Sequence, residues 1–206
     1  MNFAVEPQRM ALINVDMQNC FVHNSPIAAP DGLALLARIN QLAAVCRAAG
    51  IPVIHTSHVV RPDGSNMGLL AEIEPVKAGI INQGASSAAL HKDLVVDPRD
   101  ILLEKPRFGA FYGTDLDMIL RTRGIDTVII AGIATNVCCE TTAREAMVRD
   151  FRVFFLSDGT ATFGMGDVSG AELQKATLAT LGLVFAHILS LDAMIEQIQR
   201  AAAPGA

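Results

Sequence analysis

Short apolar runs alternate with longer amphipathic segments along almost the whole chain. Six of these runs have the length of a strand and are rich in Val, Ile, Leu and Phe: residues 10–16, 51–57, 100–105, 126–132, 151–157 and 183–190. The runs are apolar throughout rather than alternating with polar positions. This pattern is typical of strands that are buried on both faces of a parallel sheet.

The segments between and after these runs repeat apolar residues at the spacing of a helix. They cover residues 31–50, 114–124, 136–150, 169–182 and 191–202, and the final AAPGA is expected to fray. Strand–helix alternation of this kind, with right-handed crossovers, predicts an α/β fold: a Rossmann-like three-layer α/β/α sandwich with a six-stranded parallel sheet. No internal repeat divides the chain, so we expect a single domain over residues 1–206.

Residues 60–99 interrupt this alternation. VRPDGSNMG and INQGASSAALHKDLVVDP are rich in Gly, Ser, Asn and Pro, and they predict loops with short helical pieces. Excursions of this length in a compact domain usually serve a function. A lid over a ligand site and an oligomer contact are the two uses that the sequence leaves open.

Composition narrows the setting in which the protein works. The 206 residues carry a formal net charge of −5 with a pI of about 5.5, which argues against nucleic acid or an anionic membrane as a partner. The first ten residues do not resemble a signal peptide, and no apolar stretch approaches the ~20 residues of a membrane span. We therefore expect a cytoplasmic protein with reduced cysteines.

Polar residues follow three of the predicted strands, at the edge where a doubly wound sheet binds ligands. Asp16 ends the first run, Lys105 ends the third, and the fourth leads to Cys138 at a helix start. Each alone has an ordinary alternative, a turn cap for Asp16 and a solvated charge for Lys105. Together, the acid, the cation and the thiol predict a catalytic site on one edge of the sheet.

Such a trio suits catalysis by a thiol nucleophile. A free thiol has a pKa of about 8.5, so little of it is thiolate at neutral pH. We expect a helix start capped by Thr135 or Asn136, together with the ammonium of Lys105, to lower the pKa of Cys138. Asp16 would carry the proton, and N–H groups at the helix start would bind a tetrahedral oxyanion. The sequence contains no GxGxxG after the first strand, no Walker A, no GxSxG and no CxxC pattern.

Three blocks of the chain resemble the motifs of the isochorismatase-like cysteine hydrolases, in the same order: VDMQNCF (15–21), EKPRFGAFYGTDLDMILRTRGI (104–125) and AGIATNVCCETTAREA (131–146). The resemblance covers about residues 10 to 190. It implies the six-stranded sandwich and an Asp–Lys–Cys catalytic triad, which falls on Asp16, Lys105 and Cys138. It also implies a cis peptide at Ile133–Ala134 that aims the Ala134 and Cys138 N–H groups into one oxyanion hole.

The two adjacent cysteines separate branches of this family. True isochorismatases, which hydrolyse a vinyl ether, resemble this segment but carry glycine where Cys138 stands and cysteine where Cys139 stands. The amide hydrolases carry cysteine at the first position. The resemblance therefore implies an amidohydrolase that cleaves C–N bonds, with Cys138 as the nucleophile and Cys139 as a small core residue.

The second block is similar to that of the ureidoacrylate amidohydrolases and relatives that act on carbamoyl compounds. Candidates for contact with the substrate are Asn19, Phe21, His58, Phe108, Tyr112 and Thr135. For the phenylalanines, plain core packing is the alternative, and Asn19 could instead orient Asp16 or satisfy a turn. Arg107 and Arg144 could meet a substrate carboxylate, although Arg144 also suits a structural ion pair.

The family's nicotinamidases bind zinc through an Asp-x-His pair and a later His. Here HTSH supplies His55 and His58, but Val53 stands where the aspartate should be. Two histidines three residues apart at a strand end also face different directions. We therefore expect no metal and no other cofactor.

Three functions from different classes remain open. The first is hydrolysis of a small amide, ureide or carbamoyl compound through a thioester. The second is vinyl ether hydrolysis, disfavoured by Cys138, and the third is a non-catalytic binding subunit, disfavoured by the intact triad positions. Family members commonly form dimers or tetramers, so we expect a homodimer or homotetramer.

Overall fold

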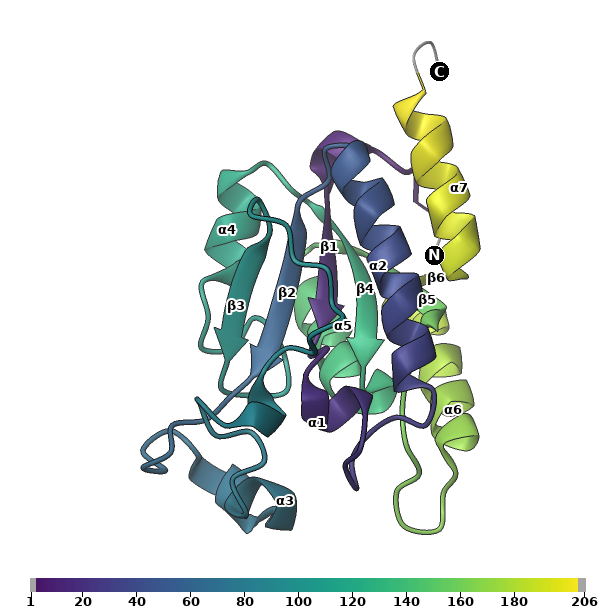
Figure 1. Cartoon of the computed structure of the whole chain (residues 1–206). Helices are drawn as coiled ribbons and strands as arrows, with labels where there is room; N and C mark the ends of the chain where they lie inside the picture. Colours follow the sequence, from purple (N-terminus) through teal and green to yellow (C-terminus); the bar gives the residue numbers. More distant parts are fainter. Residues whose placement is uncertain (1–2, 204–206) are drawn as a thin grey trace.

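The computed structural model describes residues 3–203 and places a six-stranded sheet between two layers of helices (Figure 1). The strands are β1 (Met10–Val15), β2 (Val53–His58), β3 (Ile101–Lys105), β4 (Thr127–Ile133), β5 (Arg152–Ala161) and β6 (His187–Leu189). They lie in the order β3-β2-β1-β4-β5-β6, and all neighbouring pairs are parallel. The predicted α/β/α sandwich with a six-stranded parallel sheet is confirmed.

Helices cover both faces of this sheet. The α-helices are α1 (Asn19–Val22), α2 (Gly32–Ala48), α3 (Glu74–Lys77), α4 (Leu116–Thr122), α5 (Glu140–Met147), α6 (Gly170–Val184) and α7 (Leu191–Ala202). One apolar core joins α2 and α7 to the sheet, and a second core joins α4, α5 and α6 to the opposite face. Adjacent residues of β1 supply different cores: Leu12 packs in the first and Ile13 in the second, and both are fully buried. The apolar runs of the sequence follow from this two-sided burial.

The end of the chain differs from the prediction. Residues 183–190 were expected to form one strand, but Leu183 and Val184 complete α6, and β6 holds only His187–Leu189. The amide of Phe185 still donates to the carbonyl of Leu181, so the helical pattern of hydrogen bonds outlasts the predicted end at residue 182. The expected fraying of AAPGA concerns mostly residues 204–206, which lie outside the described residues.

Residues 60–99 form loops with short helical pieces, as predicted. The pieces are a 3-10 turn at Gly68–Glu72, the one-turn helix α3 and a second 3-10 turn at Ser86–Ala88. These pieces lie below the carboxyl ends of β2 and β3 in Figure 1. Within residues 3–203, no helix has the length and apolar character needed to cross a bilayer.

The strand order places a switch point between β1 and β4. From β1 the chain moves outward to β2 and β3, and from β4 it moves the other way to β5 and β6. In open α/β sheets, the crevice at the carboxyl ends of two such strands is where ligands bind. Asp16 follows β1 directly and Cys138 lies five residues beyond β4, so the fold brings these two residues to that crevice.

Gly132 allows β4 to approach β1 closely just before the crevice. Its φ of 126° is rarely adopted by residues with a side chain, and a Cβ there would overlap the carbonyl oxygen of Val15. We expect Gly132→Ala to lower the free energy of unfolding by about 3 kcal/mol or more, because backbone strain and overpacking add. Gly50→Ala is the matched control, since Gly50 also has a positive φ (74°) but open space around it. Urea denaturation of both variants measures the difference; equal losses would contradict the close-packing explanation.

Candidate active site

Lys105 and Asp16 form a fully buried ion pair at the carboxyl edge of the sheet. Lys105 is the last residue of β3, and its side chain passes the end of β2 to place Nζ 2.8 Å from Asp16 Oδ2. Nζ also donates to the carbonyl oxygens of Arg107 (3.0 Å) and Phe108 (2.9 Å). Burial alone lowers the pKa of Lys105, but the Asp16 carboxylate and the Cys138 sulfur outweigh it, so the pKa is raised and the amine is an ammonium.

The Asp16 carboxylate is held by a hydroxyl from the neighbouring strand. Thr56 Oγ1, in β2, donates to Asp16 Oδ1 at 2.6 Å and accepts from the Asp16 amide at 3.1 Å. Asp16 has a φ of 52°, in the left-handed region that non-glycine residues seldom adopt, and such positions cluster at functional sites. Sequence analysis did not predict a role for Thr56. The available signal was a polar residue inside the apolar run at residues 51–57.

Cys138 lies in a π-helical turn between β4 and α5. The turn covers Thr135–Cys139, and single π turns frequently occur at functional sites. The predicted cap is wrong: the N-cap position is Ala134, and no side chain caps the turn. Instead, Thr135 donates to the Gln174 side chain, and Asn136 accepts from Thr162 Oγ1 at 2.6 Å.

The expected acidification of the Cys138 thiol is also wrong. Burial raises its pKa to about 12, because the Lys105 ammonium offsets only part of the desolvation and the Asp16 carboxylate acts in the opposite direction. The resting site at neutral pH therefore holds a thiol beside the ion pair.

This protonation state gives a testable pH dependence. A thiol whose pKa is about 12 is protonated at pH 7, so we expect Cys138 to react with iodoacetamide more slowly than glutathione does. The rate should rise by about tenfold per pH unit beyond pH 9, where glutathione has levelled off. Peptide mass spectrometry of Cys138 across pH 6–11 measures this. A plateau below pH 8 would show instead an acidic thiol.

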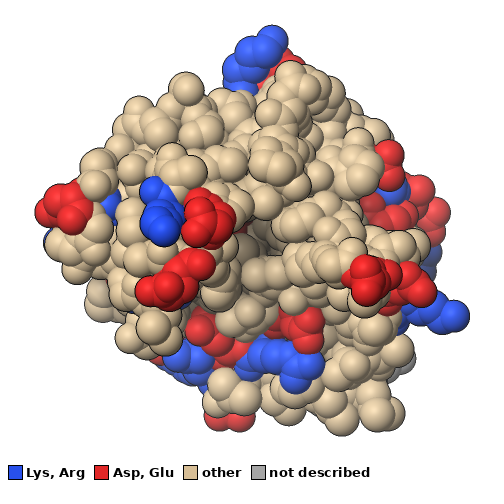
Figure 2. Space-filling view, turned by 90° about the horizontal axis from the view of Figure 1, so that it is seen from below, with Lys and Arg blue, Asp and Glu red and all other residues tan. Residues whose placement is uncertain are grey.

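A cavity of about 330 Å³ opens onto Cys138 at this end of the molecule. Figure 2 views this face, which is hollowed near its centre, with uncharged side chains along most of the hollow. Five of the residues predicted for the site line the cavity: Phe21, His58, Phe108, Ala134 and Cys138. The peptide bond between Ile133 and Ala134 is cis, as predicted.

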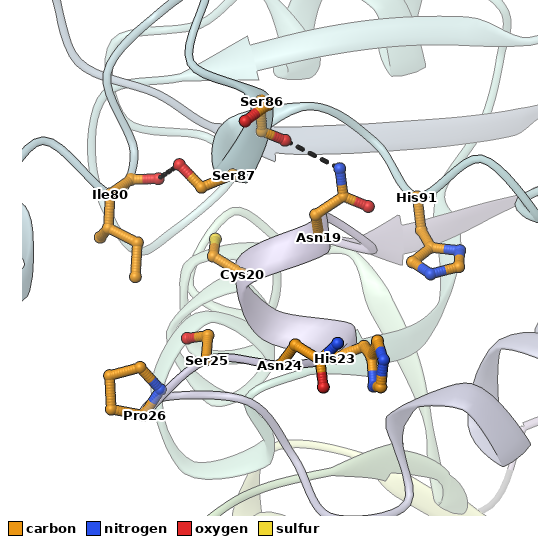
Figure 3. Close-up of a pocket in the computed structure, with 10 residues that line it drawn as sticks. All are labelled: Asn19, Cys20, His23, Asn24, Ser25, Pro26, Ile80, Ser86, Ser87 and His91. Atoms are coloured by element: carbon orange, nitrogen blue, oxygen red, sulfur yellow. Dashed lines mark hydrogen bonds between the residues drawn. The ribbon is translucent and has the colours of Figure 1, made fainter.

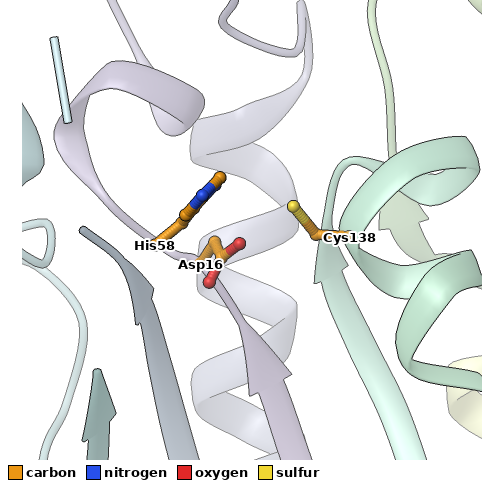
Figure 4. A group of neighbouring side chains, drawn as sticks. All are labelled: Asp16, His58 and Cys138. Carbon is orange, nitrogen blue, oxygen red and sulfur yellow. The ribbon is translucent and has the colours of Figure 1, made fainter. Parts of the chain in front are cut away.

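The two histidines of HTSH face different surroundings, as expected. His55 is fully buried, and its ring contacts Asp100 (3.0 Å) and Asn14 (3.3 Å). His58 points toward Cys138 and Asp16 (Figure 4), and ligand atoms of these three residues lie within 4.8 Å of one another. A carboxylate, an imidazole and a thiol are donors that zinc accepts, although the ammonium of Lys105 opposes a cation at Asp16.

Three of the predicted contact residues lie away from the cavity. Asn19 lines a separate polar cavity, where its side-chain amide donates to the Ser86 carbonyl oxygen at 2.8 Å (Figure 3). Tyr112 is 61% exposed and lines another cavity, beside Arg107. Thr135 is fully buried, and its hydroxyl donates a hydrogen bond to the Gln174 side chain.

The two arginines considered as carboxylate ligands also lie elsewhere. Arg107 donates to the carbonyl oxygens of Asn66 (2.8 Å) and Pro106 (2.7 Å). Arg144 pairs with Glu140 at 2.6 Å and stacks on the Phe185 ring, which is the structural role that the sequence left open for it.

The outer wall of the cavity comes largely from the irregular segment that begins after Gly68–Glu72. Apolar side chains of residues 73–81 line it, together with others from the loop after α1, the π turn and the loop after β5. These residues are Ile27, Ile73, Pro75, Val76, Ile80, Ile81, Val137, Phe163 and Met165. Sequence analysis missed them, because a loop residue carries no periodic signal of the cavity that it faces.

Comparisons with known proteins agree with this geometry. Residues 10–193 match the model of the isochorismatase domain. The chain is 37% identical to nicotinamidase 3 of Arabidopsis thaliana, covering 88% of this chain and 85% of that protein. It is 34% identical to the ureidoacrylate amidohydrolase RutB of Methylorubrum extorquens, covering 92% and 83%. A solved structure of a cysteine hydrolase from Pseudomonas syringae pv. phaseolicola matches with a TM-score of 0.90 at 33% identity, covering 97% of each chain.

Proposed function

Because the chain belongs to the isochorismatase family, we propose that it is a cysteine-dependent amidohydrolase that cleaves a C–N bond of a small amide, ureide or carbamoyl compound. One observation carries the proposal: the buried side chains of Asp16, Lys105 and Cys138 lie together at the carboxyl edge of the sheet, and a cavity opens onto the sulfur. The relatives named for amide hydrolysis support C–N chemistry. The thiol at position 138 disfavours the vinyl ether alternative.

The proposed reaction begins with a proton transfer. Asp16 takes the Cys138 proton as Sγ forms a bond with the substrate carbonyl carbon, and the resulting oxyanion accepts hydrogen bonds from the amides of Ala134 and Cys138, two residues that line the cavity. Asp16 then gives this proton to the amide nitrogen, the C–N bond breaks, and ammonia or an amine leaves a thioester on Cys138.

Hydrolysis of the thioester restores the site. Water loses a proton to Asp16 as its oxygen adds to the thioester carbon, the C–S bond breaks, and Asp16 returns the proton to sulfur. Lys105 keeps its proton throughout, because its ammonium lies 2.8 Å from Asp16 Oδ2 and donates to two carbonyl oxygens. Its charge holds Asp16 in place and stabilises negative charge that develops on sulfur.

Ammonia release from a panel of small primary amides, ureides and carbamoyl compounds tests the proposal. We expect turnover of at least one class, with a Cys138-bound acyl group detected by intact-protein mass spectrometry after rapid acid quench. An inert protein across all three classes, or turnover without any acyl adduct, would contradict it.

Two further properties stay proposals. A reducing compartment such as the cytoplasm suits the protein, since its four cysteines are free thiols. A homodimer or homotetramer is proposed on the resemblance to the family, and light scattering on the purified protein measures it.

A further inference from the structure

The walls of the cavity restrict which amide can bind. Resting on the proposed function, we propose that the substrate is an uncharged primary carboxamide or urea with a compact apolar group, and that His58 hydrogen bonds to its amide. Ureidoacrylate, the substrate class named for one group of relatives, carries a carboxylate and would be excluded.

The cavity offers no partner for a charged substrate. Of the fourteen residues that line it, only His58 and Cys138 carry a polar side-chain atom, and the rest are aliphatic, aromatic or Met. No Lys or Arg side chain from the described part of the chain takes part in the lining. A carboxylate bound here would lose its water without gaining a cation, which is strongly unfavourable.

The nearby cations cannot substitute for this missing partner. Lys105 is already paired with the Asp16 carboxylate, and its ammonium donates to the carbonyl oxygens of Arg107 and Phe108. Arg107 lines a different cavity, and Arg144 is paired with Glu140. The net charge of the ion pair and the neutral thiol is zero, so the site has no excess positive charge to attract an anion.

His58 has an unsatisfied polar atom at the floor of the cavity. The side chain is 3% exposed, and its Nε2 has no hydrogen-bond partner among residues 3–203. Burial and the Lys105 ammonium lower the pKa of this ring to about 3, so at neutral pH the ring is uncharged. A buried polar atom without a partner is unfavourable, and a substrate amide held over Cys138 would supply that partner.

The orientation of His58 is fixed by its neighbours. Its backbone amide donates to Gln18 Oε1 at 2.7 Å, and Gln18 Nε2 donates to its carbonyl oxygen at 3.1 Å. The ring packs edge-on against Phe108, with centroids 5.5 Å apart. A neutral ring held rigidly beside the nucleophile can distinguish a carboxamide from an alkyl group, and it adds no charge that would favour an anion.

Matched pairs of substrates that differ by CH₃ versus COO⁻ test the proposal: butyramide against succinamate, 4-methylbenzamide against 4-carbamoylbenzoate, and N-propylurea against 3-ureidopropionate. We expect kcat/KM for the uncharged member to be at least about 100-fold higher in the pairs that react. Equal or faster hydrolysis of the charged members would overturn this inference and leave the proposed function standing.

A charge placed in the wall should reverse part of this preference. Ile73 lines the cavity and is 39% exposed, so Ile73→Lys can be tolerated by the fold. We expect it to shift the charged-to-uncharged ratio of kcat/KM by about tenfold toward the anion. Leu69→Lys, at an 88% exposed position outside the cavity, adds the same charge and should leave the ratio unchanged. Identical ratios in the two variants would contradict the assigned wall.

The role of His58 is tested with two variants. His58→Phe keeps a ring but removes the hydrogen bond, and His58→Gln keeps a hydrogen-bonding group. We expect kcat/KM for uncharged amides to fall by about 10- to 100-fold in His58→Phe and less in His58→Gln, with labelling of Cys138 by methyl methanethiosulfonate, a probe without an amide, unchanged in both. Unchanged kcat/KM in His58→Phe would remove His58 from the proposal.

A measurement without turnover distinguishes failure of the proposed amide hydrolysis from failure of the proposed exclusion of anions. At pH 9, we expect Cys138 to prefer iodoacetamide over iodoacetate by a ratio at least about tenfold larger than glutathione shows. If no amide in the panel reacts, the proposed function fails, and this ratio alone decides whether the cavity excludes anions. A ratio equal to that of glutathione would overturn the inference.

Discussion

Replacement of Cys138 by alanine is expected to lower kcat for amide hydrolysis by about 10⁴-fold or more, while the protein remains folded. Among the described residues, Cys138 is the one that brings a thiol to the cavity, and without it no thioester can form. Water activated by Asp16 would leave only residual hydrolysis. Ammonia release measures the loss, and thermal unfolding shows that the fold is retained, since the change removes a single buried sulfur atom.

Cys139→Ala is the matched control for this variant. Cys139 is the next residue of the same π turn, fully buried in the core that α4, α5 and α6 form with the sheet, and it does not line the cavity. Burial raises the pKa of both thiols, so it is the absence of Cys139 from the cavity lining that keeps this sulfur away from a substrate. We expect near wild-type kcat with a stability loss of about 1 kcal/mol. Loss of activity in Cys139→Ala and retention in Cys138→Ala would reverse the assignment.

The parts of the fold that the sequence predicts well are those fixed by periodicity. The apolar runs at 10–16 and 126–132 lie within one residue of β1 and β4, because burial on both faces leaves no polar positions to blur them. The end of α6 was predicted less well, since LGLVF suits a helix and a strand equally, and the packing of α6 on the sheet decides between them.

The candidate site also has features that the sequence predicts and features that it does not. Asp16, Lys105 and Cys138 could be predicted to meet, because the carboxyl ends of parallel strands share one edge and the residues stand at those ends. The raised pKa of Cys138 could not be predicted. The sequence shows the helix start and the cation, which lower this pKa, but it does not show the burial, which raises it more. Tyr112 and Asn19 were misplaced for a related reason: both lie near the motif residues in sequence, but their loops turn them toward other cavities.

The second large effect concerns the buried ion pair. Lys105→Met should remove activity and lower the free energy of unfolding by about 3–5 kcal/mol, because the Asp16 carboxylate stays buried without its cation. Asp16→Asn should cost a similar amount by leaving the ammonium unpaired. The double variant Asp16→Asn/Lys105→Met removes both charges. We expect it to recover most of the stability and none of the activity, as measured by urea denaturation and ammonia release.

The pH dependence of stability gives this pair a signature of its own. The pKa of Lys105 is raised in the folded protein above its ordinary value of 10.5, so the folded state keeps the proton that the unfolded state loses at high pH. The stabilisation is fully present below about pH 10.5 and is lost as pH rises through the higher folded value.

Buried thiols have the same effect on the pH dependence as Lys105. Burial raises the pKa of Cys20, Cys46 and Cys138 to about 12, so these thiols also lower the free energy of unfolding as pH rises above 9. The comparison with the double variant cancels the part of Cys46, whose pKa depends on neither Asp16 nor Lys105. Cys20, Cys138 and Cys139 feel those charges, so both proteins are compared in a background in which these three residues are Ala. In that background, the difference in unfolding free energy between the protein with the ion pair and the double variant should be constant from pH 7 to 9 and shift against the ion pair above pH 10.5. A constant difference up to pH 12 would mean that the ion pair is not linked to folding in this way.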